Sequence, residues 1–465
     1  MNLCELLDGA VHRWPGKPAL IEGAHVLTYE GLGKLVAELA VKLRTLGLPR
    51  QTLVGLRYPN GINYVALTFA LWQIDAVVVP IPAECTQDEV ASLAETLHLD
   101  VILAQKDPGD AEPFFDDGFL TRRQPESTAA PLPPQTAFIR FTSGTTSTRK
   151  GVVLTHASVR DRVRAANTAF QIGPQDTVMW CLPMSHHFLI TIILYLSEGT
   201  TTVLTKLVVP KAYLEEAARH RATVLYATPF QYSLLAAAGP GQGLDSVRLA
   251  VSTTCGLSEE VAKAFNRAFG VPLTQALGVI ELGLVSLNSE DPLGRWNSVG
   301  RPHAHEVRIV NPDETGGGDV EIRGPGLLDA YAAPWLPREK LLHDGWFRTG
   351  DMGRLDADGF LFLLGRSTAV INLAGRKVFP EEIEEVLNRH PSVLESRVFG
   401  RAHPHLGEVV EAEVVWDSDG PDPEGLRAWC RQHLAAYKIP TGLHAVEALP
   451  KTPVTGKILR AVAVA

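Results

Sequence analysis

The sequence predicts an α/β protein with a large N-terminal domain of helix-covered mixed sheets and a small, mobile C-terminal α+β domain. Helical patterns alternate with short β-branched runs over most of the chain, which is typical of sheets covered by helices. At 465 residues the chain is too long for one ordinary hydrophobic core. The pattern changes after about residue 365, so we expect domains at 1–366 and 367–465.

In the large domain, apolar residues at helical spacing predict helices, and β-branched runs predict strands. Residues 32–46 have one apolar face and residues 63–74 are mostly apolar, so we expect an amphipathic helix and a buried helix. Residues 107–135 are rich in proline, aspartate and glycine and predict a surface connector. A further helix is expected at 259–269, and strands at 53–57, 76–80, 137–141, 152–154, 201–204, 222–226 and 271–274. Ligands are expected at the carboxyl ends of the strands.

The small domain has its own alternation of helices and strands. Residues 381–388 predict a charged helix with Ile383, Val386 and Leu387 on one face. Three glycines at 316–318, ahead of this domain, predict a hairpin turn. Another helix is expected at 424–436, and strands at 409–416 and 443–446.

Composition narrows the class of protein. The chain is 45% apolar and 20% charged, as folded proteins are, and its net charge of −9 argues against a nucleic-acid platform. The five cysteines are dispersed and form no CxxC pair, which disfavours a zinc site and a disulfide framework. The first residues lack the pattern of a signal peptide, and the longest apolar run, 188–196, is too short to cross a membrane. We therefore expect a cytoplasmic enzyme.

A loop rich in hydroxyl groups follows the strand expected at 137–141. Its sequence, FTSGTTSTRKGVVLTH, runs from residue 141 to residue 156. Such a turn is often only a solvated loop, but its N–H and O–H donors can also form an anion nest, to which Lys150 adds a mobile positive charge. The phosphate loop of kinases and GTPases is disfavoured, because Arg149 stands where that loop needs a glycine.

Four later stretches carry candidate site residues, and each also has a plainer structural explanation. Glu281 ends QALGVIE and could bind Mg²⁺, although a glutamate after a strand is usually a solvated surface residue. Asp351 ends WFRTGD and could accept hydrogen bonds from a ribose, although TGD is also a common turn. Arg366 begins a glycine-containing loop where the domain pattern changes. Lys457 lies in PKTPVTGKILR, which is either an inert basic tail or a braced loop that carries one ammonium group into a site.

Together, and in this order, these stretches resemble the adenylate-forming superfamily of acyl-CoA synthetases, peptide-synthetase adenylation domains and luciferases. The hydroxyl-rich loop is similar to the family's TSGTTG-x-PKGV, QALGVIE to its YG-x-TE, and RTGD to its ribose-binding motif. GRSTAVINLAGRKVFPEEIE resembles its hinge and the following helix, and PKTPVTGKILR its catalytic-lysine loop. The resemblance covers nearly the whole chain, from residue 27 to residue 460.

The resemblance implies a reaction in two steps. A carboxylate attacks the α-phosphorus of ATP and releases pyrophosphate, and a thiol then takes the acyl group from AMP. The obstacle is repulsion between two anions, which is about 4 kcal/mol for unit charges roughly 4 Å apart at an effective dielectric constant of about 20. Mg²⁺ and preorganised hydrogen-bond donors would offset this repulsion.

The resemblance also implies a role for each candidate residue. Glu281, with Thr145 or Thr146, would hold Mg²⁺, and Arg366 would reach the ribose or a phosphate. Lys457 would stand between the α-phosphate and the attacking carboxylate, so that Glu281, Arg366 and Lys457 are the expected catalytic residues. The residues expected to contact ATP are Thr142, Ser143, Gly144, Thr145, Thr146, Lys150, Thr254, Cys255, Gly256, Leu277, Gly278, Asp351, Arg366 and Lys457.

Thr368 occupies the family's hinge position. Rotation there would remove Lys457 after the first step and open a channel for the thiol. Leu277 and Ile280 replace a tyrosine and a threonine of the family pattern, so an adenine-stacking ring and a phosphate-binding hydroxyl are missing. Other departures are Ser147, Arg149, Thr253, Thr254 and Thr368 itself. The charged residues survive, which favours an active enzyme over a catalytically weak or inactive nucleotide-binding relative.

The stretch LPMSHHFLITI at 182–192 matches the part of the family that shapes the acyl pocket. No aspartate stands there to pair a substrate amine, whose burial without a partner would be costly, so an amino acid is disfavoured. We expect a fatty or aromatic carboxylic acid. Its expected contacts are His186, His187, Val251, Leu282 and Gly283, with Leu284 as a further apolar neighbour. The resemblance favours CoA as the thiol, and the phosphopantetheine arm of an acyl carrier protein is the alternative.

Overall fold

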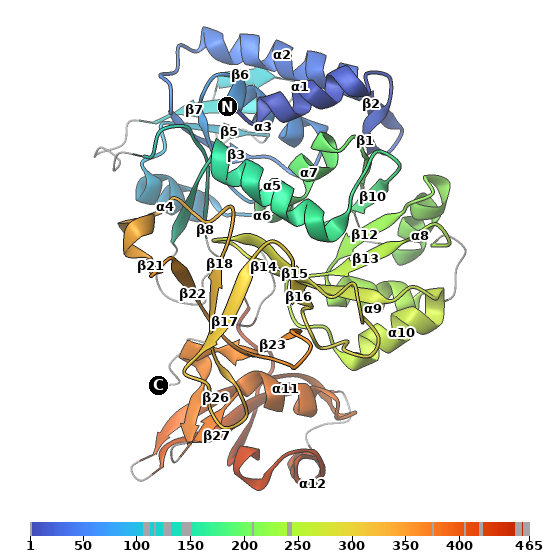
Figure 1. The fold of residues 1–465 in the computed structure, drawn as a ribbon, viewed down its shortest axis with the longest axis vertical. Helices are drawn as coiled ribbons and strands as arrows, with labels where there is room; N and C mark the ends of the chain where they lie inside the picture. Colours follow the sequence, from blue (N-terminus) through green and yellow to red (C-terminus); the bar gives the residue numbers. More distant parts are fainter. Residues whose placement is uncertain are drawn as a thin grey trace. The chain divides into compact units, whose positions relative to one another are not determined.

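A computed structural model describes residues 2–105, 112–115, 118–123, 132–141, 150–206, 209–239, 244–373, 376–403, 406–417, 422–451 and 458 (Figure 1). These residues form two compact units. The first contains the described residues up to 306 together with 323–345, and the second contains 307–322 and the described residues from 346 onward. The expected fold class, a large body of mixed sheets followed by a smaller α+β part, is confirmed. The boundary expected between residues 366 and 367 stays a prediction.

One of the two large sheets of the first unit carries the strand ends that matter for the site. Its nine strands run in the order β16–β15–β14–β13–β12–β10–β11–β1–β2. The run from β14 to β1 is parallel, whereas β2, β15 and β16 pair antiparallel. The strands are β1 (Pro18–Glu22), β2 (His25–Thr28), β10 (Thr177–Trp180), β11 (Thr201–Leu204), β12 (Val224–Ala227), β13 (Leu249–Ser252), β14 (Leu273–Val279), β15 (Gly283–Leu287) and β16 (Arg301–Pro302).

The other large sheet also has nine strands, in the order β20–β19–β9–β8–β4–β3–β5–β7–β6. Strands β5, β3, β4 and β8 are parallel, and β8 forms an antiparallel pair with β9 on either side of the hydroxyl-rich loop, as the sequence predicts. The strands are β3 (Leu53–Arg57), β4 (Val77–Pro80), β5 (Val101–Ala104), β6 (Glu112–Phe115), β7 (Gly118–Arg122), β8 (Thr136–Phe141), β9 (Gly151–Thr155), β19 (Ala330–Ala332) and β20 (Trp335–Pro337); a two-residue strand, β21, spans Leu342–His343.

Helices of the first unit cover these sheets with apolar residues. α3 is buried nearly all round, whereas α2 buries one face, as the sequence predicts. Threonine side chains cap several helices: Thr28 accepts a hydrogen bond from an amide of the first turn of α2, and Thr155 does the same for α5. The helices are α1 (Cys4–Arg13), α2 (Tyr29–Thr45), α3 (Ile62–Gln73), α4 (Gln87–Leu97), α5 (His156–Phe170), α6 (Met184–His187), α7 (Ile192–Ser197), α8 (Pro210–Arg219), α9 (Pro229–Ala237) and α10 (Glu259–Phe269).

The second unit contains two smaller sheets. In the first, β17, β18, β22 and β23 are neighbours in that order, and in the second β27 pairs with β24, β26 and β28. Helices α11 and α12 contact each other, and α11 packs on β26. The elements are β17 (Glu306–Val310), β18 (Gly318–Arg323), β22 (Trp346–Leu355), β23 (Leu361–Arg366), β24 (Ile371–Leu373), β25 (Arg376–Val378), α11 (Pro380–Asn388), β26 (Val393–His403), β27 (Gly407–Trp416), α12 (Pro423–His433) and β28 (Gly442–Ala445).

Most predicted elements are confirmed within a few residues. The glycines at 316–318 do turn the chain between β17 and β18, with φ of 81° at Gly316. The connector expected at 107–135 is wrong in part, because β6 and β7 form a hairpin on β5 at the edge of the sheet. Apolar residues in PFF and GFL are enough for edge strands even though the flanking residues read as loop. The long strand β26 was not expected from the sequence.

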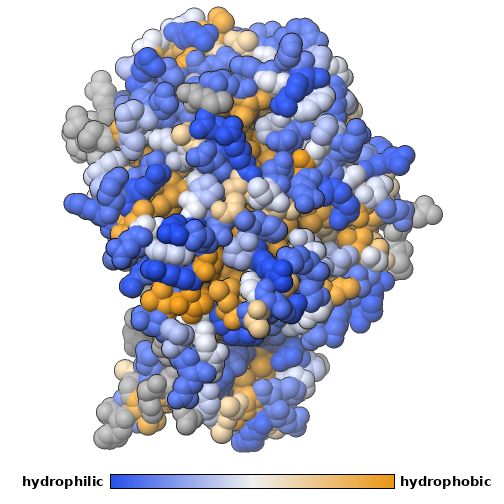
Figure 2. Space-filling model, viewed as in Figure 1, coloured by the Kyte–Doolittle hydropathy of each residue, from blue (hydrophilic) through white to orange (hydrophobic). Residues whose placement is uncertain are grey.

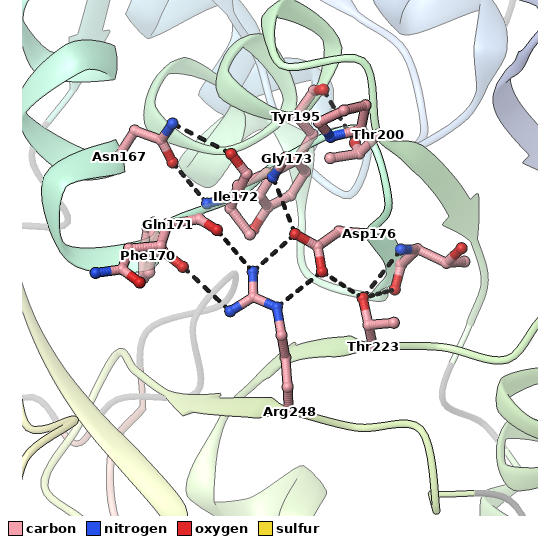
Figure 3. A network of polar contacts seen from close by, with 12 residues as sticks. Asn167, Phe170, Gln171, Ile172, Gly173, Asp176, Tyr195, Thr200, Thr223 and Arg248 are labelled. Atoms are coloured by element: carbon pink, nitrogen blue, oxygen red, sulfur yellow. Dashed lines mark hydrogen bonds and ion pairs between the residues drawn. The ribbon is translucent and has the colours of Figure 1, made fainter.

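A polar network fixes the amino ends of the parallel strands, opposite the edge where ligands are expected (Figure 3). Arg248 donates two hydrogen bonds, of 2.8 and 2.7 Å, to the Asp176 carboxylate. Thr223 donates to the same carboxylate at 2.7 Å. Burial raises the pKa of Asp176, but these donors and the amide of Gly173 outweigh it and hold the pKa below its ordinary value. The network therefore links the amino ends of β10, β12 and β13.

The surface is mostly hydrophilic on the face shown in Figure 2. Large apolar residues that are exposed come from separate elements, for example Val26, Val41, Phe230 and Leu293. No helix in the described part of the chain has both the length and the apolar character that crossing a bilayer requires.

Candidate active site

The candidate residues of the first unit gather where parallel strands of one sheet end. β12, β13 and β14 are adjacent and parallel, so their carboxyl ends lie at one edge. Thr254, Cys255 and Gly256 follow β13, and Leu277 and Gly278 lie near the end of β14. The register between β14 and β15 shifts at Leu277/Gly278, which leaves Gly278 exposed while Leu277 is buried. That a ligand binds at this edge stays a prediction.

The loop after β13 is held in a specific backbone conformation. Thr254 has φ of 78°, a left-handed value that β-branched residues seldom adopt. The amide of Leu257 donates to Oε1 of the buried Gln275 at 2.6 Å, and the amide of Thr253 donates to the carbonyl of Ala227 at 3.2 Å. Gln275 on β14 thus fixes the end of the loop that contains Thr254, Cys255 and Gly256, the expected ATP contacts. This role of Gln275 was not expected from the sequence, because it depends on a contact between residues 18 positions apart.

Glu281 follows β14 in a tightly anchored turn. Its carboxylate accepts a hydrogen bond from the hydroxyl of Tyr331 at 2.7 Å. Its backbone carbonyl accepts from the amide of Leu328 at 2.8 Å and from Nη2 of Arg162 at 2.5 Å. Arg162 also donates to the carbonyl of Ile280 at 2.9 Å. Both the side chain and the backbone of Glu281 are therefore positioned by the protein.

Lys150 and Glu281 meet at the same tyrosine. The Lys150 ammonium lies 4.9 Å from the centre of the Tyr331 ring, whose hydroxyl donates to Glu281. Lys150 directly precedes β9, and Tyr331 on β19 pairs with Val152 of that strand. A cation that could bind phosphate and a carboxylate that could bind a metal thus both contact one tyrosine. The other loop residues expected to contact ATP, Thr142, Ser143, Gly144, Thr145 and Thr146, lie outside the described residues.

Two arginines, the buried Arg162 and the partly buried Arg140, interact electrostatically with Glu281. Burial lowers the pKa of Arg162 to about 9 and that of Arg140 to about 10, and Glu281 opposes both shifts. Arg162 is 3% exposed and uses its guanidinium on backbone carbonyls. Both guanidinium groups carry a charge at neutral pH, because each pKa stays well above 7.

The residues expected to contact the acid occupy different kinds of position. His186 and His187 end α6; Nδ1 of His186 lies 2.9 Å from the hydroxyl of Ser185, and the His187 ring lies edge-on to Tyr226 with centroids 6.1 Å apart. Val251, within β13, is fully buried. Leu282, which directly follows Glu281, is also fully buried. Gly283 has φ of 95°. The apolar run that follows the histidines is largely buried in the protein core, so its apolar character already has a structural explanation.

In the second unit, two further candidates form an ion pair. Asp351 on β22 faces Arg366 on β23 across the antiparallel ladder, and Nε of Arg366 lies 2.8 Å from Oδ1 of Asp351. The Asp351 side chain is 13% exposed and that of Arg366 is 59% exposed, so the arginine has the greater freedom to contact a ligand. Thr368 lies in a short 3-10 helix, Ser367–Ala369, directly after this strand. Lys457 lies outside the described residues.

The donor set fits a magnesium ion that is held mainly by a bound polyphosphate. The described residues contain no cluster of three or more histidine, cysteine, aspartate or glutamate side chains that could hold a metal alone. Mg²⁺ commonly uses only one or two carboxylates together with phosphate oxygens and water. Glu281, oriented by Tyr331, could supply that single carboxylate.

Comparison with known proteins gives the family. The model of the AMP-binding enzyme family matches residues 7–332, and that of the AMP-binding enzyme C-terminal domain matches residues 382–457. A sulfoacetate–CoA ligase of Cupriavidus necator is 30% identical, with 99% of this chain and 96% of the relative aligned. A long-chain-fatty-acid–CoA ligase of Mycobacterium tuberculosis is 29% identical over 94% of this chain and 92% of its own length. The o-succinylbenzoate CoA synthetase of Bacillus subtilis, solved with its acyl-adenylate intermediate, has the same fold, with a TM-score of 0.86, 22% identity and coverage of 98% and 96%.

Proposed function

Because the chain belongs to the AMP-binding enzyme family, we propose that it is an ATP-dependent acid–CoA ligase. It activates a carboxylic acid as acyl-AMP with release of pyrophosphate and then transfers the acyl group to the thiol of CoA. The observation that best supports this proposal is the meeting of Lys150 and Glu281 at Tyr331, at the carboxyl edge of the parallel strands. Such an arrangement provides a cation for phosphate oxygens beside a carboxylate for Mg²⁺.

Residues of the second unit have proposed roles in the same reaction. Asp351 accepts hydrogen bonds from the ribose hydroxyls, and Arg366, its ion-pair partner, reaches the ribose or a phosphate. Lys457 assists the attack on the α-phosphorus, and Thr368 serves as the hinge. The cytoplasm is the proposed location, supported by five cysteines without a CxxC pair and by the absence of disulfides among the described residues.

Isotopic exchange between ATP and pyrophosphate tests the first step. We expect a suitable carboxylic acid from a panel of fatty, aromatic, dicarboxylic and sulfonated acids to stimulate exchange, because only acyl-AMP formation is reversible in this way. The same acid is then offered with CoA or with a phosphopantetheinylated carrier protein, and we expect the thioester to form with CoA. Transfer only to the carrier protein would favour the alternative acceptor. No exchange with any acid would favour an inactive nucleotide-binding relative.

Glu281→Gln tests the metal role. We expect the Mg²⁺ concentration that gives half-maximal exchange to rise about tenfold or more, because a contact to a charged group contributes roughly 1.5–3 kcal/mol. Glutamine keeps the size of the side chain and can still accept from Tyr331. A Mg²⁺ titration identical to that of the unaltered protein would remove Glu281 from the metal site.

A further inference from the structure

Arg140 is a partly buried cation that no step of the proposed reaction uses. It lies in β8, where its strand neighbours Phe138 and Ile139 are each 1% exposed. Its register partner is Val152 on β9. Apolar neighbours of this kind do not require an arginine, and its burial works against its charge. A structural need of the strand therefore does not explain why an arginine is present.

The guanidinium of Arg140 belongs to the edge where ligands are expected. It interacts electrostatically with Glu281, Tyr64 and Tyr226. Tyr226 lies near the carboxyl end of β12, stacks on Trp180 with ring centroids 5.5 Å apart, and touches the His187 ring. Arg140, on a strand of one large sheet, thus interacts electrostatically with Tyr226 at the strand ends of the other, beside the candidate acid-contacting His187.

Three buried donors of this cluster have no hydrogen-bond partner among the described residues: Nε of Arg140, the hydroxyl of Tyr64 and Nε1 of Trp180. Tyr64 and Trp180 are fully buried. Buried polar groups without partners are uncommon in folded proteins, so each requires an explanation. Each of the three can donate a hydrogen bond, so an acceptor oxygen within reach would satisfy it.

The charge of Arg140 also favours a ligand group with acceptor oxygens, in this case an anionic one. Although burial lowers the pKa of Arg140 to about 10, the guanidinium remains charged at neutral pH. Glu281 is the carboxylate that interacts with both Arg140 and Arg162, and it is already bonded to Tyr331 and assigned to the metal. If Mg²⁺ takes that carboxylate, Arg140 lacks a matching anion. A planar guanidinium is well suited to bind a carboxylate or sulfonate through two hydrogen bonds.

We propose that Arg140 binds a second anionic group of the substrate, so that the acid activated here carries a carboxylate or sulfonate besides the carboxylate that reacts. This inference rests on the proposed ligase function and narrows its substrate class. It narrows the fatty or aromatic acid expected from the sequence, whose apolar pocket is less needed because the apolar run at 188–196 is largely buried in the core. An aromatic acid with a second carboxylate would meet both expectations.

Matched pairs of acids in the exchange assay test the proposal. Each pair has the same length and differs in one anionic group: malonate against propionate, succinate against butyrate, sulfoacetate against propionate, and terephthalate against 4-methylbenzoate. Hexanoate and decanoate represent fatty acids. We expect at least one dianionic acid to exceed its monoanionic partner in kcat/KM by about 10²-fold, because a site built for a buried polar contact rejects analogues that lack it.

Arg140→Met should reduce that preference ratio by about 10²-fold, and Arg140→Lys should restore part of it. A merely structural role would lower the rates of both acids of a pair and leave their ratio unchanged. Arg248→Met is the matched control, since it removes another guanidinium of the same unit at the amino ends of the strands, and the ratio should not change there.

The outcomes separate this proposal from the function on which it rests. Exchange that is stimulated as well by propionate, hexanoate or 4-methylbenzoate as by the dianionic acids would overturn the second-anion proposal and leave the ligase standing. A ratio that Arg140→Met does not change would also overturn it. Exchange with none of the acids would overturn both proposals.

Discussion

Lys457→Ala is expected to slow acyl-AMP formation by roughly 10²–10³-fold, the usual cost of losing one preorganised donor at the transition state. Two anions must approach each other in this step, and the ammonium group would neutralise part of the charge between them. Thioester formation from supplied acyl-AMP should be largely spared, because the resemblance assigns Lys457 to the first step only. The measurements are ATP–pyrophosphate exchange for the first step and thioester release from chemically prepared acyl-AMP for the second.

Lys451→Ala is the matched control for this variant. Lys451 lies in the same C-terminal stretch, and its ammonium lies 2.5 Å from Oε1 of Glu395 in an exposed ion pair. Exposed pairs of this kind contribute little, so exchange should change less than about twofold. Equal losses in both steps for Lys457→Ala would contradict a lysine that serves only one of them. Equal losses for both variants would indicate a general disturbance of this part of the chain.

The sequence predicts the fold well where the pattern is local. Residues 53–57 and 259–269 appear in the structure with the predicted bounds, because β-branched runs and amphipathic periodicity act over a few neighbouring residues. The β6–β7 hairpin and the long strand β26 were missed, since both are stabilised by pairing with strands distant in sequence. The order of strands in the sheets also depends on such distant contacts.

Motif order predicts Glu281, Asp351 and Arg366 as site residues, because each belongs to a short stretch that resembles a family motif. The residues that position them carry no such local pattern. Tyr331 is 50 residues from Glu281, and Arg162 is 119 residues from it. Only the folded chain brings these side chains to the carboxylate and its backbone.

One sequence signal points to a ligand-binding role for Arg140, namely an arginine within an apolar strand. AFIRF places Arg140 between β-branched and aromatic residues, where a charge is costly unless something binds it. The sequence alone cannot say whether that partner is a carboxylate of the protein or a ligand. Tyr64 and Tyr226, which interact electrostatically with Arg140 from other elements, make the ligand the more specific explanation.

The turn that presents Glu281 depends on one buried guanidinium. Arg162 on α5 donates from Nε to the carbonyl of Gly326 at 2.5 Å, and from its other nitrogens to Ile280 and Glu281. Gly326 has φ of 73°, and a Cβ there would lie 2.3 Å from Cγ of Arg162. Gly283 approaches the same side chain, with a Cβ that would lie 3.2 Å from Cγ. Two turns are therefore shaped around the arginine and hydrogen-bonded to it.

Arg162→Met should lower the free energy of unfolding of the first unit by about 3–5 kcal/mol, because it leaves three carbonyls, one buried and two partly buried, without their charged donor. Methionine preserves most of the apolar stem, so the loss reports the hydrogen bonds more than packing. Exchange activity should fall even at temperatures where the variant remains folded, since the backbone of Glu281 loses its anchor. Urea titration followed by exchange at low denaturant measures both effects, with Arg164→Met, an exposed change on the same helix, as the control. Stability and exchange equal to those of Arg164→Met would show that Leu328 and Tyr331 hold Glu281 without the arginine.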